Sequence, residues 1–278
     1  NKTRQMRVRL TTMAGAGLMS GLGLLLFSLP GRAQSGPPQH DMAMNSAARK
    51  EVIQAVSHNL DRYYVFPAKA AAMKKSLLAQ MQHGDFDADD SAIRVADALT
   101  KALRRQSGDQ HLLVRYFARP VPRQAPNRQD AARENAAELL EQRRFNFGFA
   151  SAGRLHGNIG YLDLHQFGRP GGAATRMAAA MSLLRDTDAL IIDLRHCGGG
   201  DPDTVKLVSS YLFDGRTHLN DIYWRDENRT ERRWTLAHVD GPKYGQSRAV
   251  YLMTRHDTFS GCEDFAYALK NDRRAILI

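Results

Sequence analysis

Apolar residues recur every four positions in three stretches of the first part of the chain: Val52, Val56 and Leu60; Met73, Leu77 and Met81; and Val95, Leu99 and Leu103. This spacing gathers the apolar side chains on one face of an α-helix. The breaks between the stretches, at VFPA and HGDFDADD, contain the Pro, Gly and Asp residues that turns require. The pattern predicts a helical N-terminal domain over residues 45–118.

The end of this domain has a different pattern. In SGDQHLLVRYF, residues 107–117, a Ser-Gly-Asp turn leads into an apolar run of β-favouring residues, with His111 at the junction. We expect a strand there. Residues 119–144 contain several prolines and then a run of charged residues, which predicts a linker and an exposed, solvated helix.

From residue 145 the pattern becomes that of an α/β protein. The expected elements, in chain order, are FNFGF, a strand at 157–167, a helix at 173–186, a buried strand at 189–194, a glycine loop, a helix at 204–213, an extended segment at 218–225, a strand at 249–254 and a helix after Ser260. The predicted fold class is α+β or α/β, with a helical bundle followed by a core over residues 145–278.

Charge is distributed unevenly along the 278 residues. The net charge is +10, but five basic residues lie among the first 33, which contain no acid. A basic start, an uncharged stretch from Leu10 to Leu29 and a small-residue exit at Ala33 predict a secretory signal over residues 1–33, with an uncleaved membrane anchor as the alternative. We therefore expect a periplasmic or secreted protein that neither binds nucleic acid nor stays on the membrane after cleavage.

Both ends of the chain suggest a longer protein. Residues 34–44, QSGPPQHDMAM, are predicted to be a linker after the signal. The chain starts at Asn1 rather than Met and stops at Ile278 inside the β-favouring run AILI. We expect the core over 145–278 to be truncated at its C-terminus.

Two loops carry candidate chemistry. In DLRHCGGGDP, residues 193–202, three glycines follow a buried strand, so that backbone N–H groups can point into a cavity and hold an oxyanion; the alternative is a tight turn. Ser260 forms an S-x-x-E capping box with Glu263, but a serine at a helix N-terminus also suits a nucleophile. The N–H groups of Gly261 and of Gly198 or Gly199 are the candidate oxyanion donors.

A nucleophilic serine needs a base that removes its proton. His111, His196 and His256 lie at the ends of predicted loops, whereas His165 lies on one face of a predicted strand. Each of these histidines taken singly is equally compatible with a structural role.

Four motifs occur in order: NFGF, LHGNIGYLDLHQF, ALIIDLRHCGGGDP and TFSGCEDFAYALK. Together they resemble peptidase family S41, which includes the tail-specific or C-terminal processing peptidases. The resemblance covers roughly residues 50 to 278 and is strongest to the branch without a PDZ domain that contains interphotoreceptor retinoid-binding protein modules. It implies a helical N-terminal domain and a crotonase- or ClpP-like ββα core.

The resemblance also implies roles for particular residues. Ser260 matches the nucleophile of a T-x-S-x-x-E motif, and His111 matches the base used by members similar to tricorn protease. Other members use a lysine at a position beyond Ile278, and an acid that orients the histidine is likewise expected later in the chain. Peptides or proteins are the implied substrates, no cofactor is implied, and oligomeric state is not indicated. The sequence shows no cluster with the spacing of zinc ligands, so no metal is expected.

One residue departs from the family pattern. Cys197 stands where the glycine loop of the family usually has asparagine, and Cys262 follows the serine by two positions. If the two strands before these loops are neighbours, the two cysteines can form a disulfide across the mouth of the site; the sequence leaves open whether they pair. Because retinoid-binding relatives use this fold for binding, the alternative function is a non-catalytic module for a lipid-like ligand or peptide.

Overall fold

The structure is a computed structural model that describes residues 40–118, 128–225 and 227–278. The predicted signal over 1–33 and most of the predicted linker therefore lie outside the described residues. The chain divides into two compact units. The first contains the described residues up to 118 together with 222–231, and the second contains 128–221 and 232–278.

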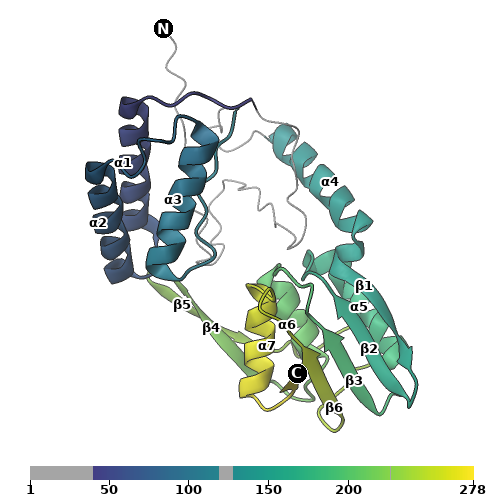
Figure 1. Cartoon of the computed structure of the whole chain (residues 1–278). Helices are drawn as coiled ribbons and strands as arrows, with labels where there is room; N and C mark the ends of the chain where they lie inside the picture. Colours follow the sequence, from purple (N-terminus) through teal and green to yellow (C-terminus); the bar gives the residue numbers. More distant parts are fainter. Residues whose placement is uncertain (1–39, 119–127, 226) are drawn as a thin grey trace. The chain divides into compact units, whose positions relative to one another are not determined.

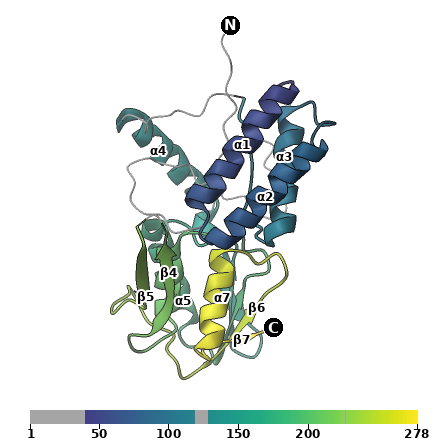
Figure 2. The same cartoon turned by 90° about the vertical axis from the view of Figure 1, so that its left-hand side faces the viewer.

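The first unit is built on three helices (Figures 1 and 2), which are α1 (Ser46–Tyr63), α2 (Pro67–His83) and α3 (Ala92–Ser107). Asn45 and Ser91 cap α1 and α3 by accepting hydrogen bonds from backbone N–H groups in the first turn, and Pro67 begins α2. Their apolar faces form one core, which confirms the helices that the four-residue spacing predicts.

The segment predicted as a strand after α3 is not one. Residues 111–117 run as an irregular segment, although Leu112 and Val114 are fully buried in the helical core. The Thr100 hydroxyl on α3 accepts a hydrogen bond from Val114 N at 2.9 Å and lies 3.1 Å from the Val114 carbonyl oxygen. Arg104, also on α3, donates to the Leu112 carbonyl at 2.9 Å. Side chains of α3 thus satisfy backbone groups that would otherwise pair with a second strand.

The last residues of the predicted linker also belong to this unit. Ala43 forms a β-bridge with Ser91, and the backbone N–H of Met44 donates to the Asp90 carbonyl at 2.7 Å. The Met44 side chain is buried in the helical core. The sequence pattern missed this because Pro and polar residues dominate the segment as a whole.

The second unit contains most of the remaining elements, which are α4 (Arg128–Arg144), η1 (Asn146–Gly148), β1 (Phe149–Leu155), β2 (Ile159–Leu164), α5 (Pro170–Leu184), β3 (Ala189–Asp193), α6 (Pro202–Ser210), β6 (Ala249–Met253), α7 (Gly261–Asn271) and β7 (Ile276–Leu277). β4 (His218–Trp224) and β5 (Arg229–Trp234) pair with each other. Residues 222–231, where the two strands connect, belong to the first unit, and the rest of both strands belongs to the second. The pattern did not predict β5, whose sequence RTERRW is mostly charged.

The main sheet has the order β1-β2-β3-β6-β7, with β1 antiparallel to β2 and the other neighbours parallel. α5, α6 and α7 each connect two adjacent parallel strands, and the strand order advances in one direction. Because such crossovers are almost always right-handed, all three helices are expected on one face of the sheet. Leu162, Ile192 and Leu252 alternate with half-buried residues and are completely buried on the face that the helices cover.

This topology places two loops side by side. β3 and β6 are parallel neighbours, so the glycine loop after β3 and the Ser260 loop after β6 leave the sheet at the same edge. The Thr258 hydroxyl donates to the Leu194 carbonyl at 2.9 Å, and Phe259 N donates to the Cys197 carbonyl at 3.1 Å. The fold class predicted from the sequence, a helical region followed by an α/β core, is confirmed.

Candidate active site

Ser260 lies at a strained turn between β6 and α7. Its backbone has φ 59° and ψ −123°, a conformation that costs a residue with a side chain about 1–3 kcal/mol. The predicted capping box is present: Glu263 N bonds the Ser260 side chain, and Ser260 N donates to Glu263 Oε2 at 2.7 Å. Capping alone does not require a left-handed backbone, because an ordinary N-cap residue is extended. Strain of this kind is typical of a nucleophile held on a sharp strand-to-helix turn.

The glycine loop approaches this serine more closely than a side chain would allow. A Cβ atom on Gly199 would lie 2.9 Å from Ser260 Cβ and 3.1 Å from its Oγ, and Gly199 has φ +117°. Gly200 has φ +144°, and a Cβ there would lie 2.1 Å from the carbonyl oxygen of Phe167. Two of the three consecutive glycines are therefore required by contact with the serine and with the extension of β2.

The backbone donors around Ser260 differ in what they contact. Gly198 N already donates to the carbonyl of His165 at 3.1 Å. Gly199 N points to Cys262 Sγ at 2.9 Å, and sulfur is a weak acceptor. Gly261 is the first residue of α7, where backbone N–H groups carry the positive end of the helix dipole. Gly199 and Gly261 are thus better suited than Gly198 to receive an oxyanion.

Cys197 and Cys262 form a disulfide with a Cα–Cα distance of 6.0 Å. The strands before the two loops are neighbours, which is the condition under which the sequence allows this pair, and the structure settles the question that the sequence leaves open. Both cysteines are completely buried. The bond fastens the residue before the three glycines to the second residue of α7, and it explains how the loop is held without the asparagine that the family pattern would place at position 197.

The start of the glycine loop is fixed by an ion pair. Arg195 donates from Nε and Nη2 to the two carboxylate oxygens of Asp193, at 3.0 and 2.7 Å, and Tyr161 donates from its hydroxyl to Oδ2 at 2.8 Å. Burial by itself would raise the pKa of the Asp193 carboxyl, but the hydrogen bonds from Arg195 and Tyr161 outweigh it and lower the pKa to about 2. Burial beside this carboxylate raises the pKa of Tyr161 to about 12.

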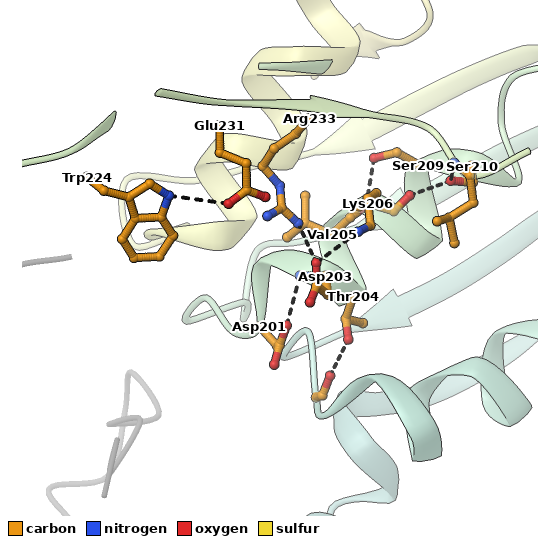
Figure 3. A network of polar contacts seen from close by, with 12 residues as sticks. Asp201, Asp203, Thr204, Val205, Lys206, Ser209, Ser210, Trp224, Glu231 and Arg233 are labelled. Atoms are coloured by element: carbon orange, nitrogen blue, oxygen red, sulfur yellow. Dashed lines mark hydrogen bonds and ion pairs between the residues drawn. The ribbon is translucent and has the colours of Figure 1, made fainter. Parts of the chain in front are cut away.

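The end of the loop is fixed at the N-terminus of α6 (Figure 3). Asp201 caps the helix by accepting from Asp203 N at 2.8 Å, while Lys206 and Arg233 converge on the Asp203 carboxylate at 3.0 and 2.8 Å. Burial opposes ionisation of Asp203, but the two cations prevail and lower its pKa. Lys206 and Arg233 therefore have a structural partner, and the glycine loop is anchored at both ends.

In the first unit, His111 is oriented by a nearby acid, although the family pattern would place such an acid later in the chain. His111 Nδ1 lies 3.0 Å from Asp109 Oδ1, which also accepts from His111 N at 2.9 Å. The hydrogen bond with the His111 side chain lowers the pKa of Asp109 despite partial burial. With Nδ1 donating to a carboxylate, the neutral ring has its lone pair on Nε2, as a general base requires. Tyr64 donates to Asp109 Oδ2 at 3.1 Å.

The other candidate histidines lie in the second unit. His256 is exposed and its Nε2 lies 2.7 Å from Asp257, which indicates a surface ion pair. His165 and His196 lie at the end of β2 and in the glycine loop, with ring centroids 5.4 Å apart. The structure thus gives His165 a neighbour that its position on a strand face did not reveal.

Within the part of the chain that is described, no helix is both long and apolar enough to span a bilayer.

The loops and their order match a known family. The family model described as "Peptidase family S41" matches residues 158–278, and the model "N-terminal domain of Peptidase_S41 in eukaryotic IRBP" matches residues 42–145. The chain belongs to peptidase family S41. In this S41 chain, the region matched by the first model contains the glycine loop and Ser260. The region matched by the second model contains His111.

Solved structures are similar to this S41 chain at low identity. A putative peptidase from Parabacteroides merdae is 16% identical with a TM-score of 0.51, covering 84% of this chain and 75% of its own. The photosystem II D1 C-terminal processing protease is 20% identical with a TM-score of 0.35, covering 47% and 33%; mature CPAF is 14% identical with a TM-score of 0.35, covering 46% and 39%. The chain thus spans about a third of the length of the processing protease. The likeness to the structure from Parabacteroides merdae, at 16% identity, concerns the fold alone.

Proposed function

We propose that this protein is a serine-type peptidase in which Ser260 attacks the carbonyl carbon of a peptide bond. The backbone N–H groups of Gly199 and Gly261 receive the oxyanion of the tetrahedral intermediate. His111 takes the proton of the serine hydroxyl and passes it to the leaving amine, and Asp109 holds the imidazole in the required tautomer. Water then attacks the carbonyl carbon of the acyl-enzyme: His111 takes a proton from the water and gives it to the Ser260 oxygen as the ester bond breaks, which releases the carboxylic acid and restores the serine.

The conformation of Ser260 is the observation that carries this proposal. A serine kept at φ 59°, with a glycine packed against its Oγ, keeps its hydroxyl at a helix N-terminus at a cost in stability. Evolution tolerates such a cost at functional sites more readily than at a simple cap. Membership of family S41 supports the reaction class, and peptides or proteins are the proposed substrates.

Labelling with a fluorophosphonate tests the nucleophile directly. We expect the full chain to form a covalent adduct at Ser260 and Ser260→Ala to form none. Ser182→Ala is the matched control, because Ser182 lies on α5 and donates to a carbonyl of its own helix; its labelling should equal that of the wild type. A folded wild-type protein that never labels would favour the binding module for a lipid-like ligand or peptide.

The proposal includes export. Residues 1–33 have the pattern of a secretory signal, and a structural disulfide suits an oxidising compartment. Sequencing the N-terminus of the protein recovered from the periplasm or the medium should give Gln34 as its first residue. Recovery of the uncleaved chain in the membrane fraction would instead identify the segment as an anchor.

A further inference from the structure

Three potential metal ligands meet beside the glycine loop. Asp163 on β2, His165 just after it and His196 in the loop each offer one ligand atom, and these atoms all lie within 4.8 Å of one another. Among the described residues this is the one group of three or more His, Cys, Asp and Glu side chains with that property. His196 comes from a segment 31 positions away from His165, so that the group exists only in the folded core.

Two of the three atoms already have the spacing of ligands that share an ion. Asp163 Oδ1 and His165 Nε2 lie 3.1 Å apart. Tetrahedral zinc, with bonds of about 2.0–2.2 Å, separates its ligand atoms by about 3.3 Å. Both atoms are shielded from solvent, and neither has a well-directed hydrogen bond within the described part of the chain. Buried polar atoms in this state are uncommon in folded proteins, and one cation bound between the two atoms would satisfy both.

The third ligand can complete the site without moving the backbone of the core. His196 is exposed, and its ring centroid lies 5.4 Å from that of His165. Rotation of an exposed side chain toward the pair costs little. Two imidazoles and one carboxylate, with a fourth position open to water, are a ligand set that zinc uses, whereas magnesium and calcium prefer oxygen atoms throughout.

We propose that Asp163, His165 and His196 bind one Zn²⁺ ion that joins the end of β2 to the glycine loop. The backbone already links these segments, because the His165 carbonyl accepts from Gly198 N at 3.1 Å and Phe167 N donates to the Gly199 carbonyl at 2.9 Å. The ion adds a side-chain link at the same place. It stabilises the second unit by binding the folded state alone, and this proposal does not depend on the serine chemistry.

Titration of the tag-free full chain with Co²⁺ and then Zn²⁺ tests the site. Reductant is omitted, because thiol reductants bind zinc and would open the Cys197–Cys262 bond. We expect one equivalent of Co²⁺ to produce the visible absorption of a four-coordinate ion, and Zn²⁺ to displace it. Zn²⁺ should also raise the Tm of the wild-type protein.

Two ligand variants and one control decide the assignment. His196→Ala changes an exposed residue, and Asp163→Asn keeps the size of its side chain; each should weaken Co²⁺ binding at least about tenfold and remove the Tm increase. His218→Ala is the control, since His218 Nε2 lies 2.7 Å from Asp221 in a two-residue surface pair, and it should bind as the wild type does. Absence of binding in the wild type, or equal affinity in His196→Ala, would show that His165 and Asp163 form an ion pair only.

Discussion

Ser260 combines a capping side chain with a backbone conformation that glycine adopts more easily. Ser260→Gly should relieve strain of about 1–3 kcal/mol. Two effects oppose this gain: loss of the capping side chain costs a few tenths of a kcal/mol, and the greater freedom of glycine in the unfolded chain costs up to about 1 kcal/mol. We therefore expect its free energy of unfolding to equal or exceed that of the wild type, with no fluorophosphonate labelling. Urea unfolding measures this.

Comparison with Ser260→Ala separates strain from capping. Alanine keeps a Cβ atom at φ 59° and loses the cap, so that this variant should be less stable than the wild type by about 1 kcal/mol. An alanine variant more stable than the glycine variant would mean that the turn stores no strain.

The His111 and Asp109 side chains act as a pair in the proposed mechanism. His111→Ala should lower the rate of acylation by about two orders of magnitude or more, which is the usual contribution of a general base. Asp109→Asn should also lower it, since an amide no longer favours the tautomer with hydrogen on Nδ1. Stopped-flow acylation with an activated ester measures both rates. His58→Ala, on the exposed face of α1, is the control; unchanged acylation in His111→Ala would assign the base to another residue.

At the scale of elements, the end of β3 depends on one ionised carboxylate. The pKa of Asp193 is about 2 in the folded protein and about 3.9 in an unfolded chain. Because the folded pKa is the lower one, the stabilisation is fully present above the unfolded pKa and is lost as pH falls toward 2. Asp193→Asn should therefore reduce stability at pH 7 and flatten the loss of stability between about pH 5 and pH 2. Thermal unfolding across this pH range checks it, with the exposed Asp186→Asn as control.

The sequence predicted correctly those elements in which the spacing of apolar residues matches the face that is buried. The helices of the first unit and strands such as β2 and β3 bury one face each, and their patterns show it. Residues 111–117 were misjudged because their apolar side chains enter a core while Thr100 replaces a partner strand. β5 was missed because a paired but mostly exposed strand needs no apolar alternation.

The candidate site was predictable to a similar degree. The sequence identified the glycine loop and Ser260 as loops that follow strands, but it left open whether the two strands are neighbours and whether Cys197 and Cys262 pair. Asp109 lies in the same motif as His111 but was not identified as its partner, because a spacing of two residues does not reveal a hydrogen bond. The cluster of Asp163, His165 and His196 depends on the register of separate segments, which no local pattern contains.

At the scale of the molecule, the two units have separate cores, and the disulfide lies in only one of them. It closes a loop of 65 residues, for which the chain-entropy estimate of stabilisation is about 4 kcal/mol. The Cys197→Ala, Cys262→Ala double variant should lower the protection of β3 and α7 amides against hydrogen exchange by a large factor. Amides of α3 should keep wild-type protection. Equal loss in both units, measured by mass spectrometry, would show that they unfold as one.

The Cys197–Cys262 bond also makes the maturation of the protein chemically visible. In the folded core the pairing of β3 and β6 holds its two sulfur atoms together, and we therefore expect oxidation to follow assembly of the core. A newly made copy whose thiols still react with an alkylating reagent is one in which the glycine loop has not yet reached Ser260. Pulse-chase alkylation therefore measures when the glycine loop and the Ser260 turn assemble in living cells, without any substrate.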